Sequence, residues 1–250
     1  MSPFRSLLWK AWLETRGRFI SAAVVLTILG VSTVVRARAT IAGWESVHSS
    51  ETMSYPLYIW LSLSHGFLQF LWIIAAVVLG LGGLLRERAA GSSAFTLAIP
   101  VSRSTHVTAR ALVGAAEAVV LGFIPGVIVV VLSPLAGFTY PLGQALIFGG
   151  LIVSAGMIFY CLGFFLSHLL HGEYAAPGVG LGLIGAFWVF TKIPRFSALN
   201  VFDAMDGKLN LVGYTFFMGA SYPVATIAAS LTCATLFVAM SGLRMRRVDF

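Results

Sequence analysis

Few residues of this chain could do chemistry, and Glu117 is the most unusual of them. It lies inside a long apolar run, seven residues after Arg110. In a helix that rises 1.5 Å per residue, this spacing places it about 10 Å deeper than the arginine. Carboxylates inside membrane segments are rare and usually functional. The sequence leaves two roles open, because Glu117 could pair with a neighbouring helix or line a transport pathway.

A second candidate is the pair His168 and His171 followed by Glu173. Two imidazoles at positions i and i+3 with a nearby carboxylate share one helical face and could hold zinc or copper. Histidines near the C-terminal end of a helix are, however, stabilised by the helix dipole without any metal. We therefore expect no metal site here.

The motifs of nucleotide-using and hydrolytic enzymes are missing or misplaced. A phosphate-binding loop needs a lysine followed by serine or threonine, but Lys10, Lys192 and Lys208 precede alanine, isoleucine and leucine. Residues 180–185 match G-x-G-x-x-G inside an apolar run instead of after a strand, which favours helix packing. Neither a G-x-S-x-G elbow nor an H-E-x-x-H zinc helix is present. We expect no catalytic residues, no bound cofactor and no enzyme activity of this chain.

The composition is that of a protein dissolved in lipid. Of 250 residues, 58% are hydrophobic and only 10% are charged, against about 25% charged in soluble proteins. Six runs approach the roughly 20 apolar residues that cross a bilayer. They are residues 19–35, 62–85, 109–132, 142–169, 175–191 and 222–243. The sequence therefore predicts an all-α integral membrane protein with six transmembrane helices in a single domain over residues 1–250.

The basic residues predict the orientation. A net charge of +7 could indicate a nucleic-acid partner, but these residues gather at the ends of apolar runs, so we expect none. With the N-terminus in the cytoplasm, eleven basic residues lie on that side and five on the other. Because basic loops stay inside, we expect a multi-pass protein of the cell inner (plasma) membrane with both termini cytoplasmic.

Two segments flank the predicted spans. Residues 1–18 carry apolar side chains at helical spacing and basic ones on other faces, which predicts an interfacial amphipathic helix. The alternative is an extension of the first span, because Gly17 is the only break. Residues 192–221 form an external segment whose apolar part, 209–219, is too short to cross and suits a re-entrant or interfacial position.

The connection between the second and third spans, residues 86–106, is the most informative cytoplasmic segment. Gly91 breaks the preceding helix, Ser92 or Ser93 can cap a short one, and Pro100 ends it. Ser102 or Ser104 can then cap the third span. The short helix carries an apolar tip, Phe95, Leu97, Ala98 and Ile99. Such a tip suits docking into a groove of another protein, whereas a plain connector would not need it.

Here the sequence resembles a known family. Arg86-Glu87-Arg88-Ala89-Ala90-Gly91-Ser92, followed by Leu97-Ala98-Ile99-Pro100-Val101-Ser102-Arg103, resembles the signature of type-2 ATP-binding-cassette (ABC) export permeases. The amphipathic N-terminus, six spans, external segment and basic C-terminal residues 244–250 are similar to that family as well. The resemblance covers the whole chain in architecture but only residues 86–103 and 244–250 in motif.

The resemblance implies a permease subunit whose cytoplasmic coupling helix receives the stroke of separate ABC ATPase subunits. Glu87, Arg88 and Gly91 would form the turn into that helix, and Phe95, Leu97 and Ile99 would be part of its docking surface. ATP and Mg would be bound by the partner ATPase. The unit would contain a second permease copy or paralogue in the lipid bilayer. Residues 92–94 depart from the family, whose members often carry threonine and an acidic residue there.

The expected function is thus an ATP-driven exporter subunit that forms the substrate pathway as a dimer and carries a hydrophobic or amphipathic cargo. Two alternatives remain open. One is a membrane-embedded enzyme or sensor with a site near Glu117 and His168 to Glu173. The other is an ion-coupled secondary transporter.

Overall fold

Long apolar stretches of the sequence form the helices of this protein. The computed structural model describes residues 3–48, 53–81, 102–170, 175–195, 200–207, 211–212, 215–216 and 222–247. The long helices are α1 (Pro3–Val47), α3 (Gln69–Gly80), α6 (Arg103–Leu132), α7 (Leu142–Leu169), α8 (Ala175–Thr191) and α10 (Val224–Arg247). A short helix α2 (Tyr55–Ile59) and a π-helix η1 (Trp60–Leu68) lead directly into α3, and a 3-10 turn η2 (Ser133–Ala136) extends α6.

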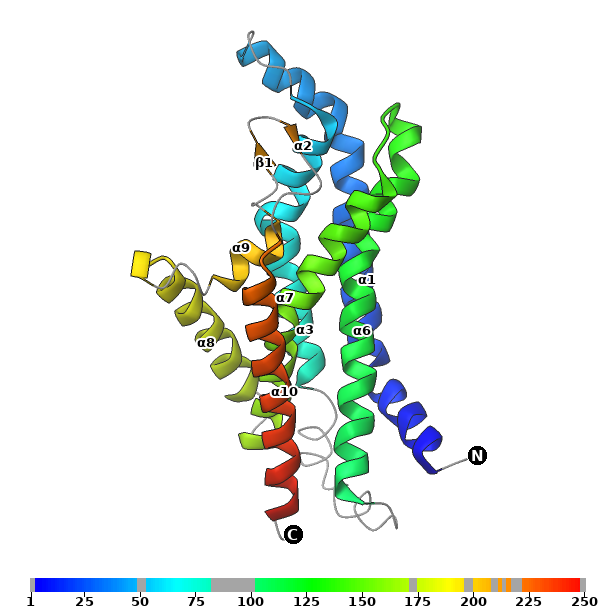
Figure 1. Cartoon of the computed structure of the whole chain (residues 1–250). Coiled ribbons are helices and arrows are strands. Elements are labelled where there is room, and N and C mark those ends of the chain that lie inside the picture. Colours follow the sequence, from blue (N-terminus) through cyan, green and yellow to red (C-terminus); the bar gives the residue numbers. More distant parts are fainter. Residues whose placement is uncertain are drawn as a thin grey trace.

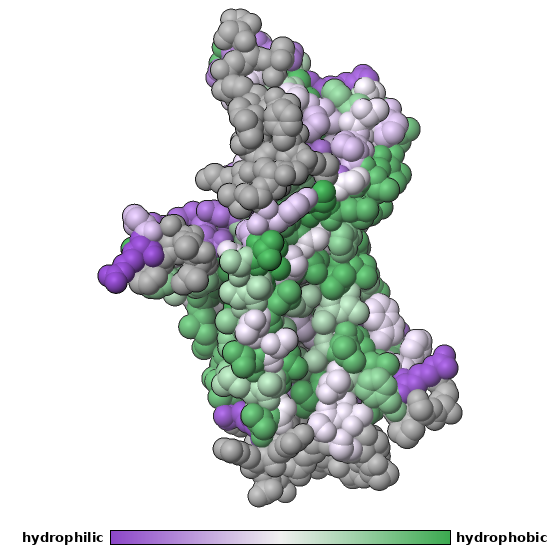
Figure 2. All heavy atoms as spheres, viewed as in Figure 1, coloured by the Kyte–Doolittle hydropathy of each residue, from purple (hydrophilic) through white to green (hydrophobic). Residues whose placement is uncertain are grey.

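The prediction of an all-α membrane protein is confirmed. Within the described residues, five helices are long and apolar enough to cross a membrane: α1, the α2–η1–α3 rod, α6 with η2, α7 and α10. Helix α8 is apolar but has only 17 residues, so a sixth crossing remains a prediction. Helices α7 and α8 have the predicted bounds, while the second rod starts at Tyr55, before the predicted residue 62. Figure 2 shows hydrophobic residues over the middle of the visible face and hydrophilic ones toward its ends.

Helices α6 and α7 form the centre of the arrangement. The first helix, α1, packs mainly on α6, while α10 and α3 pack mainly on α7. Figure 1 shows α8 diverging from the bundle, and it places both chain ends at the same end of the molecule. The C-terminal end of α3 and the start of α6 point toward that end as well. The helix ends on either side of residues 82–101 therefore both lie on the side of the two termini.

The crossing of α3 and α7 is tight because it is built on two glycines. A Cβ atom placed on Gly80 would lie 2.6 Å from the backbone nitrogen of Phe164, and one on Gly163 would lie 2.7 Å from the backbone oxygen of Val77. Neither position has room for a side chain. Nearby, the fully buried Trp72 packs against Gly156 and donates its indole Nε1–H to the backbone oxygen of Ala118, 3.0 Å away. This bond ties α3 to α6 inside the apolar interior, where an unpaired donor would be costly.

Residues 3–18 are helical, as predicted, but they continue into the first span without a break. Helix α1 passes through Gly17, where an added Cβ would meet nothing within 4 Å. Leu7, Ala11 and Thr15 are buried on one face of this end, so contact with the bundle supports the helix here. The 45 residues of α1 correspond to a length of about 68 Å, roughly twice the hydrocarbon thickness of a bilayer.

The segment between α8 and α10 contains a six-residue helix α9 (Val201–Asp206) and two strands, β1 (Leu211–Val212) and β2 (Thr215–Phe216). The strands pair antiparallel, with Leu211 opposite Phe216 and Val212 opposite Thr215. The apolar part of the predicted external segment thus includes a short hairpin. Its position relative to the membrane remains a prediction. Helix α9 packs on α7 and on the α2–η1–α3 rod.

Candidate functional site

Helix α9 is a short buried element held by polar contacts at each end. At its start, the side-chain oxygen of Asn200 accepts hydrogen bonds from the backbone nitrogens of Phe202 and Asp203, at 3.2 and 3.4 Å. At its end, Gly207 adopts the left-handed conformation with a φ of 67°. A capping asparagine and a terminal glycine are the standard start and stop signals of a helix. They allow six residues to form a helix in the segment between α8 and α10.

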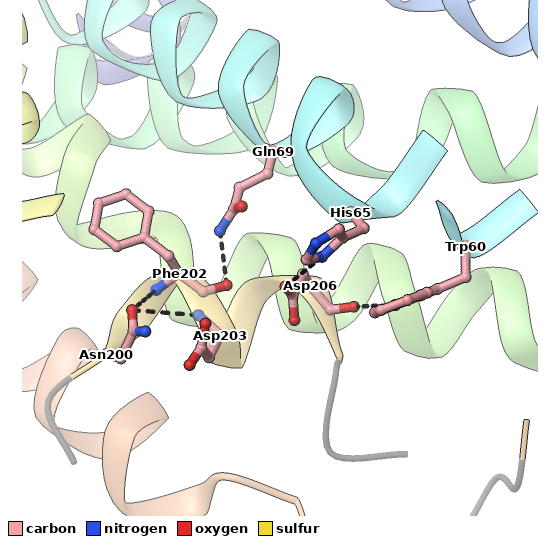
Figure 3. Close-up of polar contacts among 7 residues, drawn as sticks. All are labelled: Trp60, His65, Gln69, Asn200, Phe202, Asp203 and Asp206. Atoms are coloured by element: carbon pink, nitrogen blue, oxygen red, sulfur yellow. Dashed lines mark hydrogen bonds and ion pairs between the residues drawn. The ribbon is translucent and has the colours of Figure 1, made fainter. Parts of the chain in front are cut away.

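Three side chains of the α2–η1–α3 rod bind α9, and we call these contacts the α9 clamp (Figure 3). Trp60 donates its Nε1–H to the backbone oxygen of Asp206 at 2.7 Å, and Gln69 donates its Nε2–H to the backbone oxygen of Phe202 at 2.7 Å. Between them, Nδ1 of His65 lies 3.0 Å from the Oδ2 carboxylate oxygen of Asp206. The clamp thus bonds to both the first and the last turn of α9.

The histidine–carboxylate pair is buried on one side only. The side chain of Asp206 is 5% exposed, whereas that of His65 is 49% exposed. The ring of His65 also stacks on Trp60, with centroids 4.8 Å apart. This arrangement fixes the imidazole between an aromatic ring and a carboxylate while leaving part of it accessible. In enzymes, a carboxylate often orients a histidine that activates a nucleophile. Among the contacts of the described residues, no nucleophile lies beside His65.

The second polar cluster joins α1 to α6 near the end of the molecule that carries both termini. Glu117 is 4% exposed, and its Oε1 accepts a hydrogen bond from the hydroxyl of Thr15. Its other oxygen, Oε2, has no partner among the residues that the structure describes. About two turns before Glu117 on α6, Arg110 donates to Glu14 at 3.2 Å, and Lys10 lies 3.6 Å from the same carboxylate.

Glu117 therefore has the interhelical contact that its role as a structural partner requires. It also lines a groove of about 910 Å³ between α1 and α6. That groove is mostly apolar and carries one cationic side chain, and its lining includes Arg5, Leu8, Trp9, Trp12, Phe19, Val113 and Val120. The other predicted role of Glu117, lining a transport pathway, remains a prediction.

The contacts of His168 are structural. Its Nδ1 lies 2.8 Å from the backbone oxygen of Phe164, and the residue is buried. Arg244 of α10 donates to the backbone oxygens of His168 and Leu169 at 3.1 and 3.4 Å, which satisfies carbonyls that a helix end leaves without partners. His171 and Glu173 lie outside the described residues. Among the residues that the structure describes, no three His, Cys, Asp or Glu side chains come together as a metal site would require.

An aromatic cluster lies near the N-terminal end of the α2–η1–α3 rod. Tyr55 stacks on Phe138 with ring centroids 4.4 Å apart, and its hydroxyl lies 2.7 Å from that of Ser133. Tyr58 donates to the backbone oxygen of Thr33 at 2.8 Å. Tyr140 packs edge-on against Tyr55, and burial raises the pKa of its phenol above the ordinary value. These contacts anchor α2 to α1 and η2.

The residues expected to couple to an ATPase, Glu87, Arg88, Gly91, Phe95, Leu97 and Ile99, lie outside the described residues. The predicted cap that follows them is confirmed, because the hydroxyl of Ser102 accepts a hydrogen bond from the backbone nitrogen of Thr105 at 3.2 Å. No protein-family model matches the chain, and no curated protein is significantly similar to it in sequence. The assignment of a function therefore rests on the chain's own residues.

Sequence reasoning did not find the α9 clamp. Trp60, His65 and Gln69 were visible as polar groups in or beside an apolar run, but they do not share one face of an α-helix. The detectable signal was on α9 itself, where a capping asparagine, Asn200, is followed seven residues later by Gly207.

Proposed function

We propose that this chain is the membrane-spanning permease subunit of an ATP-driven ABC exporter, with separate cytoplasmic ATPase subunits and a second permease copy or paralogue. The observation that carries the proposal is the segment 86–103, which resembles the coupling region of type-2 export permeases. The helix ends that this segment joins support the proposal, because the end of α3 and the start of α6 lie toward the same end of the molecule as both termini (Figure 1). On this proposal that end is cytoplasmic.

The packing supports a mechanism of rigid-body movement. Helices α1 and α6 are joined by the Thr15–Glu117 hydrogen bond and the Glu14–Arg110 ion pair. Helix α3 is locked to α7 by the glycine crossing. A push on the segment between α3 and α6 therefore acts on two preassembled helix pairs. Closure of the ATPases would move these pairs relative to each other and open the pathway alternately to the two sides.

The lining of the helix grooves supports a hydrophobic or amphipathic cargo. Between α3 and α8 lies a groove of about 510 Å³ whose lining includes Phe70, Ile73, Leu181 and Trp188, with Gln69 as its polar residue. Apolar pockets of a few hundred Å³ with few polar groups are typical of sites for small molecules. In the proposed dimer this groove would face the pathway or the lipid.

The experiment first searches the genes that flank this one for a Walker-motif ATPase, whose absence there would count against the proposal. It then co-expresses that ATPase with the chain and measures co-purification and ATP turnover. We expect Phe95→Asp to reduce complex formation about a hundredfold, because an unpaired carboxylate loses its hydration in an apolar docking groove. Ser49→Asp, on the predicted external side, is the matched control. If the Phe95 variant co-purifies and turns over ATP like the control, the docking role of this segment is wrong. ATP hydrolysis by the verified chain alone would also contradict the proposal.

A further inference from the structure

The α9 clamp depends on the unusual form of the helix that carries it. Trp60, His65 and Gln69 are five and four positions apart. In an α-helix of 3.6 residues per turn, His65 would point about 140° and Gln69 about 180° away from Trp60. A π-helix bonds each residue to the fifth along, so side chains four and five apart lie on one face. Only the π form of residues 60–68 directs all three side chains to α9.

The π form in turn depends on the clamp. The π-helix is rare and occurs mostly as single-turn bulges inside α-helices, so a nine-residue π segment needs support from its surroundings. Here α9 supplies that support at both ends of the segment, through Trp60 at its first residue and Gln69 directly after its last. The remaining contact, His65 with Asp206, lies between them. A return to α geometry would turn Trp60 and Gln69 to opposite sides and break the clamp.

We propose that α9 is a conformational latch that holds residues 60–68 in the π form. When α9 detaches, the segment returns to α geometry and α2 rotates relative to α3. Tyr55 and Tyr58 hold α2 against η2 and α1, near the far end of α6, whereas Trp72 and the glycine crossing hold α3 against α6 and α7. The rotation therefore changes the contacts of α2 with α1 and η2 while α3 stays in place on α6 and α7. The latch belongs to the chain itself and does not require an ATPase partner.

The test uses the full chain in lipid nanodiscs, labelled with 5-fluorotryptophan. The Trp60 resonance is assigned by its loss in Trp60→Phe, and its broadening by a water-soluble paramagnetic agent reports how often α9 uncovers it. We expect Gln69→Met combined with Asp206→Asn to raise this broadening rate about tenfold, since the Gln69 hydrogen bond is lost and the contact of His65 with Asp206 is weakened. The indole bonds to the backbone oxygen of Asp206, which both substitutions leave in the chain.

Two controls make the result specific. Asp203→Asn removes a charge from the same short helix, outside the clamp, and should leave the Trp60 rate unchanged. The resonance of Trp72, which is 0% exposed, should stay protected in every variant. An unchanged Trp60 rate in the double variant, or an equal rise in Asp203→Asn, would overturn the proposal.

A cross-link tests the latch in the other direction. In a background of Cys161→Ala and Cys233→Ala, a short bifunctional thiol reagent joins His65→Cys to Asp206→Cys, whose native side chains lie in contact. The linked protein should show the slow Trp60 broadening of the wild type even when Gln69→Met is added. Failure of the link to form, or fast broadening in the linked protein, would show that α9 does not hold the segment.

Discussion

Replacing Gly163 with alanine should destabilise the protein, although alanine is the better helix former. A Cβ at this position would lie 2.7 Å from the backbone oxygen of Val77 and 3.1 Å from its Cα. Backbone atoms cannot rotate away as a side chain can, so the helices α3 and α7 must separate by about 0.7 Å to reach ordinary contact. Overpacking of this kind costs about 1–3 kcal/mol. It outweighs the gain of up to about 1 kcal/mol from removing a helical glycine.

Gly150→Ala in the same helix is the matched control, because its Cβ would meet nothing within 4 Å. This variant should be stabilised by about 0.5–1 kcal/mol, through helix propensity alone. The two substitutions are chemically identical, so the difference in sign isolates the crossing. Unfolding in detergent, followed by tryptophan fluorescence, measures both. A Gly163 variant as stable as the Gly150 variant would refute the argument that backbone contact sets the distance between α3 and α7.

Three further outcomes follow from the polar contacts and the charge pattern. Thr15→Val should lower the free energy of unfolding by about 1–3 kcal/mol, because it leaves buried Glu117 without its hydrogen-bond donor. Ser21→Ala, on the exposed face of the same helix, is the control. An equal loss of unfolding free energy in both variants would contradict this prediction. Arg244→Met should lower the free energy of unfolding by about 1–2 kcal/mol, because it leaves the carbonyls at the end of α7 without their donor. The control is Thr232→Val, at an exposed position of α10. Equal stability of the two variants would mean that water satisfies those carbonyls. A reporter fused to the C-terminus should be active only in the cytoplasm, and periplasmic activity would reverse the predicted orientation.

Hydrophobic patterning located the long helices but not all of their ends: α1 runs to Val47, past the predicted residue 35, and the second rod starts at Tyr55. Apolar runs give the bounds of α7 and α8, and the cap at Ser102 follows from the type of residue that accepts a backbone hydrogen bond. These features depend on local physics. Gly17 was less informative, because whether a glycine ends a helix depends on its tertiary neighbours. The buried face formed by Leu7 and Ala11 continues the helix past it.

The candidate site could be predicted only in part. Glu117 was visible as a lone carboxylate in an apolar run, but its donor, Thr15, comes from a helix about a hundred residues earlier. The α9 clamp was hidden for a geometric reason. Periodicity searches assume 3.6 residues per turn, and under that assumption Trp60 and Gln69 lie on opposite faces. A π segment is stabilised by what it touches, so local sequence carries little sign of it.

The contact between α1 and α6 also bears on how the protein is made. Thr15 is synthesised 102 residues before its acceptor Glu117, a delay of about 5–20 s at ordinary rates of translation. During this time α1 has entered the membrane without the helix against which it packs. The exposed apolar side chains along its middle, such as Val24 and Ile28, suit a helix that first meets only lipid or the insertion machinery. Pairing of the first helix is therefore a late event of biogenesis, completed only after the ribosome has passed residue 117.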